Sequence, residues 1–484
     1  MDRTYERAIE IIDSRNRVRR PDSRPADAVR SEVAVSPGYT APSVRGNPGL
    51  LGMAEWLQQI GHSADEVNNL KIIHVAGTKG KGSTCSFAES FLRAHGKRTK
   101  YPAKTGMYTS PHLIYPEERI RLNGVPIDRS RFATYFFEMW DRLPQLQSVY
   151  DSSKGVVERG PRTLQLYALL AFHVFIREEV QVAIFETHSG GEYDATNVIE
   201  RPVVTAVTTL GMDHISTLGP TIENIAWHKA GIFKSGAVAL STTQCGGIMV
   251  EHVLNERAAA SGEAVRFVGN DDRLPAGMRQ LEPAVQRQNA SLALAAAEAW
   301  LDERGAGQLD PSDIRSGVEQ WSWPGRFQIV RDIRNEHCTW YLDAAHNDMS
   351  VVIAAQWFAT QAAREAVTIL IFSHINELRD SVALLKSLAT ALRDTEVRID
   401  HVVFTSYDKM PTKEGASTEN DNLLREVWHG LQPNTRGWWE PSIDGAVNRT
   451  RSIAADNGDR AQTQVLITGS QHLVGPALNI LQPW

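Results

Sequence analysis

The stretch from residue 72 to residue 84 constrains this chain most, because it joins three local patterns in a fixed order. The apolar run Ile72-Ile73-His74-Val75-Ala76 is typical of a buried strand, and it ends in the glycine-rich turn Gly77-Thr78-Lys79-Gly80-Lys81-Gly82-Ser83. A helical pattern follows from Thr84. A strand, a glycine turn and a helix in this order form a backbone cradle for phosphate groups. We therefore predict an α/β fold built around a phosphate-binding loop.

The residue types inside the turn point to a nucleoside triphosphate. Gly77, Gly80 and Gly82 let the backbone turn its N–H groups inward, where the helix N-terminus adds to their attraction for phosphate oxygens. Lys81 can reach the terminal phosphates, and Ser83 stands where such loops direct a hydroxyl at Mg²⁺. A glycine separates Lys81 from Ser83, so the loop is a variant of the common G-x-x-x-x-G-K-[ST] spacing. The alternative is a glycine turn that binds nothing.

The overall composition limits the class of protein. The length of 484 residues favours two domains, and 42% hydrophobic with 22% charged residues is typical of a soluble globular protein. A net charge of -6 argues against nucleic acid as the main partner. No apolar run is long enough for a membrane span. Three scattered cysteines fit a reducing compartment. We expect a cytoplasmic monomer, with a mitochondrial pool as the alternative location.

Strand-like and helical segments alternate along the chain, which indicates parallel sheets with covering helices. The expected strands are residues 71–76, 180–186, 203–210, 237–241, 265–268, 339–342, 367–372, 401–405 and 465–468. The segment Trp321-Ser322-Trp323-Pro324-Gly325 breaks the pattern. We predict an N-terminal helix and flexible arm over residues 1–49 and an ATP-binding P-loop domain with a mostly parallel sheet over residues 50–324. A smaller, Rossmann-like α/β domain is expected over residues 325–484.

Three ionisable side chains stand where an open parallel sheet leaves room for ligands, beyond the carboxyl ends of its strands. Glu186 ends an apolar segment, where its charge needs either a salt bridge or a metal ion. His214 follows another expected strand and is either a ligand of the same metal or a structural residue. Lys229 lies in the apolar segment 225–232, where it either pairs with an acid or loses its proton. Composition alone favours the salt bridge, whereas a neutral lysine can take up CO₂ and become a metal-binding carbamate.

A series of specific motifs follows the glycine turn along the chain. They are Thr109-Ser110-Pro111-His112-Leu113, Glu118-Arg119-Ile120-Arg121-Leu122-Asn123-Gly124, Gly190-Gly191-Glu192-Tyr193-Asp194-Ala195-Thr196-Asn197, Leu210-Gly211-Met212-Asp213-His214, Ile225-Ala226-Trp227-His228-Lys229-Ala230-Gly231-Ile232, Trp323-Pro324-Gly325-Arg326, Leu342-Asp343-Ala344-Ala345-His346-Asn347 and Gly469-Ser470-Gln471-His472-Leu473-Val474-Gly475. Over most of residues 50–484 the chain resembles the eukaryotic type of the folylpolyglutamate synthase family, which is related to the bacterial Mur ligases. The resemblance implies an ATP-dependent ligase that joins L-glutamate to the side-chain carboxylate of a folate. The implied route is an acyl phosphate, with release of ADP and phosphate.

The same resemblance implies roles for individual residues. Those that match nucleotide contacts are Gly77, Thr78, Gly80, Lys81, Gly82, Ser83, Asn289 (at the adenine), Arg326, Asp343 and His346. Those that match metal ligands are Ser83, Ser110, Glu186, His214 and Lys229, the last as a carbamate at a second ion. Lys81, His214, Lys229 and Arg326 match residues at the chemistry. The implied cofactor is Mg²⁺, as one or two ions, with K⁺ or another monovalent cation as a further option.

Two residues beside Glu186 depart from the family pattern. The family has a glycine and an aliphatic residue where this chain has His188 and Ser189, and the segment 161–168 near the expected folate site departs as well. These changes spare the ATP and metal residues. A paralogous ligase that acts on another carboxylic acid in specialised metabolism is therefore an open alternative. A nucleotide-binding protein without catalysis is a third hypothesis, against which the retained Lys81 and Lys229 argue.

Overall fold

The computed structural model describes residues 2–16, 49–145, 153–245, 247–363, 365–374, 381–406, 416–456 and 462–483. These residues group into two compact units, Met1–Ser322 and Trp323–Trp484. Most of the predicted N-terminal arm, residues 17–48, lies outside the described part of the chain. Among the helices that the structure describes, none combines the length and the apolar character that crossing a bilayer requires.

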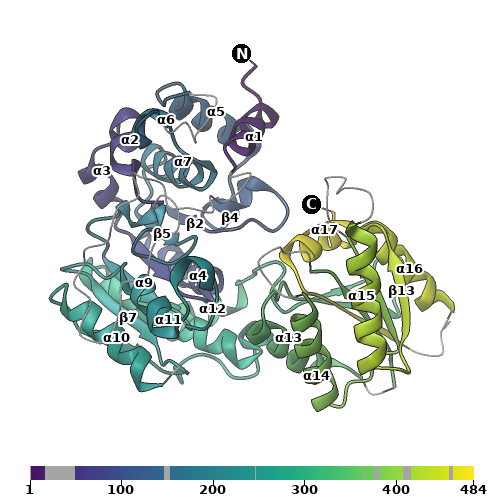
Figure 1. Cartoon of the computed structure of the whole chain (residues 1–484). Coiled ribbons are helices and arrows are strands. Elements are labelled where there is room, and N and C mark those ends of the chain that lie inside the picture. Colours follow the sequence, from purple (N-terminus) through teal and green to yellow (C-terminus); the bar gives the residue numbers. More distant parts are fainter. Residues whose placement is uncertain are drawn as a thin grey trace. The chain divides into compact units, whose positions relative to one another are not determined.

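The first unit alternates strands and helices, as its sequence predicts (Figure 1). Its strands are β1 (Ile73–Ala76), β2 (Thr105–Tyr108), β3 (Ile120–Leu122), β4 (Val125–Pro126), β5 (Val182–Glu186), β6 (Val204–Val207), β7 (Val238–Thr242) and β8 (Val265–Val268). Its α-helices are α1 (Tyr5–Ser14), α2 (Met53–Gln59), α3 (Ala64–Asn69), α4 (Lys81–Thr99), α5 (Arg129–Trp140), α6 (Val156–Arg159), α7 (Thr163–Arg177), α8 (Ile215–Leu218), α9 (Ile222–Ala230), α10 (Ile248–Ala259), α11 (Ala284–Glu303) and α12 (Pro311–Glu319). Short 3-10 helices are η1 (Pro116–Arg119), η2 (Ala195–Val198) and η3 (Arg279–Leu281).

Sheet topology places the glycine turn in the middle of the first unit. Within the described residues the sheet has eight strands in the order β4-β3-β2-β5-β1-β6-β7-β8. Strands β2 and β5 to β8 run parallel with β1, whereas β3 and β4 form an antiparallel edge. Strand β1 lies between β5 and β6, so the loops after these three strands meet at one edge of the sheet.

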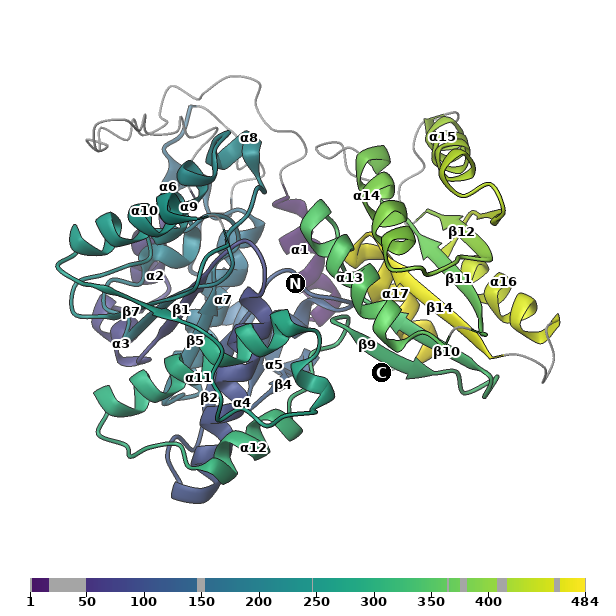
Figure 2. The same cartoon turned by 90° about the horizontal axis from the view of Figure 1, so that it is seen from below.

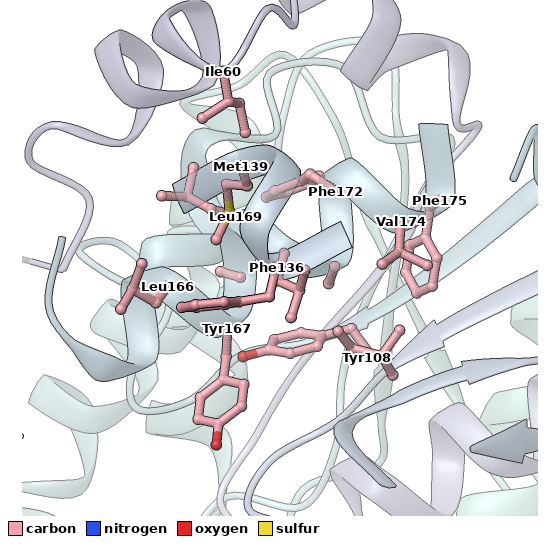
Figure 3. Packing of buried hydrophobic residues seen from close by; sticks show 14 of the residues in the cluster. Ile60, Tyr108, Phe136, Met139, Leu166, Tyr167, Leu169, Phe172, Val174 and Phe175 are labelled. Carbon is pink, nitrogen blue, oxygen red and sulfur yellow. The ribbon is translucent and has the colours of Figure 1, made fainter. Parts of the chain in front are cut away.

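Helices cover both faces of this sheet. Ala183 and Phe185 of β5 belong to a buried cluster with α7, of which Figure 3 shows Tyr108, Phe172 and Phe175. Because side chains alternate along a strand, Glu186 points to the face opposite Phe185. Helix α4 packs on β1, β2 and β5, and it also contacts α11 and α12 (Figure 2). Helix α1 packs on α5 and α7, so this N-terminal helix is part of the first unit.

The second unit is a smaller α/β layer structure. Its strands are β9 (Gln328–Arg331), β10 (Cys338–Leu342), β11 (Val367–Phe372), β12 (His401–Thr405), β13 (Arg436–Glu440) and β14 (Thr463–Thr468), and its helices are α13 (Asp348–Gln361), α14 (Ser381–Asp394), α15 (Ala416–Leu431), α16 (Ile443–Asp456) and α17 (Gln471–Leu481). In the described residues the strand order is β13-β12-β11-β14-β10-β9, parallel except for β9. The predicted fold class, a P-loop sheet unit followed by a smaller Rossmann-like unit, is confirmed.

Candidate functional site

The glycine turn has the predicted strand-loop-helix form. It leaves β1 at Ala76 and enters α4 at Lys81, three residues earlier than the sequence pattern indicates. Gly80 has a φ of 88° in the left-handed region, and a Cβ there would collide with Asn289 Oδ1. A Cβ at Gly77 would collide with the Thr208 hydroxyl. Both positions therefore require glycine for conformation and for space.

Hydrogen bonds hold this loop against the end of β6. The backbone N–H groups of Thr78 and Lys79 donate to Thr209 O at 3.0 and 3.1 Å, and the Thr208 hydroxyl donates to Lys79 O at 2.6 Å. The first N–H groups of α4 have no acceptors within the helix, because the first turn of any α-helix leaves its donors unpaired. The fixed loop and the helix N-terminus together form an anion site of the kind that binds phosphates.

Lys81 and Glu186 are brought together across the sheet edge. Lys81 Nζ lies 3.7 Å from Glu186 Oε1, and their side chains are 15% and 6% exposed. The Ser110 N–H donates to Glu186 Oε2 at 3.1 Å. The carboxylate thus faces both the phosphate loop and the segment after β2, as the positions of β1, β2 and β5 in the sheet dictate.

A second ion pair at this edge was missed by the sequence analysis. Lys79 Nζ lies 3.7 Å from Asp213 Oδ2, and both side chains are largely buried. His214, the neighbouring residue that was predicted as a ligand, is the N-cap residue of α8 with a φ of 52° and donates its own N–H to Asp213 Oδ1. An acid in the loop after a buried strand, in a chain with two lysines in its phosphate loop, is the signal that could have found Asp213.

Lys229 lies on α9 and is buried directly beneath the glycine loop. Its Nζ donates a hydrogen bond to Gly77 O at 2.7 Å. Burial, with Lys81 nearby, lowers the pKa of Lys229 well below its ordinary value. The amine therefore has much more neutral character than a surface lysine. The composition favoured a salt bridge between Lys229 and an acid. The hydrogen bond of Lys229 instead goes to a backbone carbonyl of the glycine loop.

The donor set at the sheet edge fits a hard divalent cation that is also bound by phosphate oxygens. In the described part of the chain, no three His, Cys, Asp or Glu side chains form a metal site by themselves. Glu186 supplies one buried carboxylate, and Ser83 and Ser110 supply hydroxyls on the two adjoining segments. Mg²⁺ binds through one or two carboxylates together with substrate phosphates, so few protein ligands are needed.

Asn289 and the predicted residues of the second unit have defined local positions. Asn289, on α11, is buried beside Gly80 and donates from Nδ2 to Gln286 Oε1 at 2.9 Å. In the second unit, Asp343 follows β10 and accepts the Phe327 N–H at 3.0 Å, which holds the turn that carries Arg326.

Further along the same segment, His346 Nδ1 lies 2.9 Å from Ala344 O. Arg326, Asp343 and His346 therefore belong to one local cluster around the end of β10.

Asp194 organises the loop that follows Glu186. Its Oδ2 accepts the N–H groups of His188 and Ser189, both at 3.0 Å, and its Oδ1 accepts the N–H and the hydroxyl of Thr196 at 3.0 and 2.8 Å. Burial alone would raise the pKa of Asp194, but His188 and the N–H donors of Ser189 and Thr196 hold it well below its usual range. Asp194 belongs to the sequence motif of residues 190–197, from which no role was predicted for it.

Comparisons with known proteins identify the family. The family model described as "Dihydrofolate synthetase, C-terminal domain" matches residues 326–480. Folylpolyglutamate synthase from Neurospora crassa is 36% identical over 458 residues, which cover 89% of this chain and 85% of that protein.

Solved structures agree with this match. The structure of Mycobacterium tuberculosis folylpolyglutamate synthase complexed with ADP and AMPPCP has a TM-score of 0.73 at 25% identity, and the match covers 90% of this chain and 96% of that one. The bifunctional folylpolyglutamate synthase/dihydrofolate synthase of Yersinia pestis, complexed with AMPPNP and a Mn ion, has a TM-score of 0.66 at 23% identity over 90% of this chain and 94% of that one, and shows the same fold. The resemblance predicted from the motifs is thus confirmed, and the chain belongs to the folylpolyglutamate synthase family.

Proposed function

We propose that this chain is an ATP-dependent ligase that joins L-glutamate to the glutamyl side-chain carboxylate of a tetrahydrofolate. The observation that carries the proposal is the buried Lys81–Glu186 pair beside a glycine loop in which neither Gly77 nor Gly80 has room for a Cβ. Membership of the folylpolyglutamate synthase family, at 36% identity over 89% of the chain, supports the acceptor and the amino acid.

The proposed chemistry activates a carboxylate, because a carboxylate and an amine do not condense unaided in water. A carboxylate oxygen of the acceptor attacks the γ-phosphorus of ATP, the bond to the β,γ-bridging oxygen breaks, and ADP leaves. The glutamate amine then attacks the acyl phosphate, loses a proton, and expels inorganic phosphate. Two anions approach each other in the first step, so the Lys81 ammonium and the loop N–H groups must offset their repulsion.

Mg²⁺ is the cofactor we propose for this site. Glu186, with the hydroxyls of Ser83 and Ser110 and the imidazole of His214, would hold the ion. Mg²⁺ would supply positive charge that stabilises the transferring phosphoryl group. We propose Lys229 as the ligand of a second ion after it takes up CO₂ as a carbamate, and its burial with low proton affinity supports this. A requirement for K⁺ is a further proposal.

The remaining assignments extend the same proposal. Asn289, packed against Gly80, is proposed as an adenine contact, and Arg326, Asp343 and His346 of the second unit as ATP contacts. The domain organisation stays a proposal: an N-terminal helix and arm over residues 1–49, an ATP-binding P-loop domain over residues 50–324 and a C-terminal α/β ligase domain over residues 325–484. We propose a monomeric, cytoplasmic enzyme whose partners are small molecules: a folate, L-glutamate and ATP.

One assay tests the activity and separates it from its alternative. Purified chain is incubated with Mg-ATP, L-glutamate and tetrahydrofolate, and the products are analysed by mass spectrometry and for released ADP. We expect a folate product heavier by one glutamyl residue, with one ADP released for each residue added. ADP release with another carboxylic acid, but no change in the folate, would instead favour the paralogous ligase. No ADP release with any acid would contradict both.

A further inference from the structure

His188 joins the two loops that flank Glu186. It lies two residues after Glu186, where β5 ends, and its side chain is only 5% exposed. Its Nε2 is 2.6 Å from the Tyr108 hydroxyl, and its Nδ1 is 3.4 Å from Asp194 Oδ1. The imidazole therefore bridges the end of β2 to the loop that ends at Asp194. A glycine, the residue that the family resemblance led us to expect at this position, cannot make either contact.

The direction of these contacts follows from their chemistry. A carboxylate only accepts hydrogen bonds, so the His188 tautomer that suits both contacts carries its proton on Nδ1, toward Asp194, and leaves the Nε2 lone pair for Tyr108. Nε2 then accepts the hydroxyl proton of Tyr108. The rings of Tyr108 and His188 are perpendicular, with centroids 5.5 Å apart. This arrangement suits a hydrogen bond from the Tyr108 hydroxyl to the Nε2 lone pair, which lies in the plane of the imidazole. A hydrogen bond between Tyr108 and His188 and a 3.4 Å polar contact between His188 and Asp194 thus link the three side chains in series.

These linked side chains lie beside the proposed metal ligands. Tyr108 pairs with Phe185 in the parallel register of β2 and β5, and it is followed at once by Thr109 and Ser110. The Ser110 N–H bonds to the Glu186 carboxylate. The two strand ends are thus connected twice, once through Ser110 and Glu186 and once through Tyr108 and His188. The second connection limits how far apart the two loops can move.

We propose that His188 is a positioning residue, which through Tyr108 and Asp194 fixes the spacing of the Ser110 and Glu186 loops and thereby the direction of the Glu186 carboxylate. The inference rests on the proposed role of Glu186 as a metal ligand. Partners that orient a metal ligand typically change metal affinity or activity about 10- to 100-fold when they are removed. In this proposal His188 acts through these two neighbours and is not itself a metal ligand.

The test measures metal binding separately from activity. Isothermal titration gives the Kd of Mn²⁺ for the full chain in the presence of AMPPCP, for wild type, His188→Leu, His188→Gln and Tyr108→Phe. We expect His188→Leu to weaken Mn²⁺ binding about 10- to 100-fold and to lower kcat with tetrahydrofolate, with KM for glutamate unchanged. His188→Gln retains a polar group that can accept the Tyr108 hydroxyl, so it should recover most of the affinity.

Further variants test whether His188 and Tyr108 act through the same connection, and whether loss of any buried histidine has the same effect. His188→Leu combined with Tyr108→Phe should bind Mn²⁺ no more weakly than His188→Leu alone, because both changes remove the same connection. His173→Gln is the matched control, since His173 is also a buried histidine with two polar contacts but lies in a separate cluster with His62 and Glu138. If His188→Leu does not fold, Tyr108→Phe carries the test, with a smaller loss in the same direction.

The outcomes separate this inference from the proposed function. Wild-type Mn²⁺ affinity in both His188→Leu and Tyr108→Phe, or an equal loss in His173→Gln, overturns the positioning role and leaves the proposed function intact. A wild-type chain that binds no Mn²⁺ with AMPPCP and releases no ADP overturns the proposed function, and the inference with it.

Discussion

The Lys81 ammonium group lies 3.7 Å from the Glu186 carboxylate, at the point where the first residue of α4 meets the end of β5. Each charge compensates the other in a largely buried position, and removal of one partner of such a pair leaves an uncompensated charge. The same two groups also face the place where phosphates and a cation would carry charge. The pair therefore links the stability of the sheet edge to the chemistry proposed there.

Lys81→Ala should abolish most of the activity without unfolding the chain. In the proposed mechanism the substitution removes the positive charge that offsets the transferring phosphoryl group, so kcat should fall about 10²- to 10³-fold. Lys97→Ala is the matched control, because Lys97 lies on the same helix and its side chain contacts Gln320 at the surface. Steady-state release of ADP measures both. Near-normal turnover in Lys81→Ala would remove Lys81 from the mechanism.

Glu186→Gln should change the metal dependence of the reaction. The amide is nearly isosteric, but it has no charge to hold a divalent cation or to pair with Lys81. We expect the Mg²⁺ concentration for half-maximal rate to rise and the maximal rate to fall. Glu178→Gln is the matched control, because the Glu178 side chain is also largely buried but contacts Lys104, Arg131 and Tyr135 instead. It should leave the Mg²⁺ titration unchanged. An unchanged titration in Glu186→Gln would place the metal elsewhere.

Gly80→Ala should weaken nucleotide binding more than the strain of the backbone alone explains. An alanine at a left-handed φ costs about 1–2 kcal/mol, wherever it stands. Gly236 has a similar φ of 77°, and a Cβ added there would meet no atom within 4 Å, whereas a Cβ at Gly80 collides with Asn289. We therefore expect Gly236→Ala to lower only the free energy of unfolding, and Gly80→Ala to weaken AMPPCP binding as well. Calorimetric titration distinguishes them, and equal affinities for the two variants would contradict the clash.

The sequence predicted the parts of the site that are local. The turn after β1 and the acid at the end of β5 follow from short apolar runs that end in glycine or in a charge, and the structure confirms both elements. Strands 265–268, 367–372 and 401–405 have the predicted bounds. For 367–372 and 401–405 the reason is that largely apolar runs mark buried parallel strands.

What the sequence did not predict depends on pairing between distant segments. Strands β2 and β13 were missed because each contains a glycine and few aliphatic residues, so only their place in the sheets makes them strands. The contacts of Lys79 with Asp213 and of Tyr108 with His188 arise from strand order and register. Periodicity in a single sequence carries no information about which strands become neighbours.

His173→Gln should make the stability of the first unit less sensitive to acid. Burial lowers the pKa of His173, and nearby His62 lowers it further. The hydrogen bond between His173 and Glu138 opposes this shift. The folded chain therefore binds fewer protons than the unfolded chain once the pH falls below the ordinary histidine pKa of about 6.5, so its free energy of unfolding decreases there. Between pH 7 and pH 5 we expect a loss of about 1–2 kcal/mol from this residue in the wild type, which His173→Gln should not show. Urea unfolding at both pH values measures it. Equal losses in the two proteins would show that another group takes up the proton.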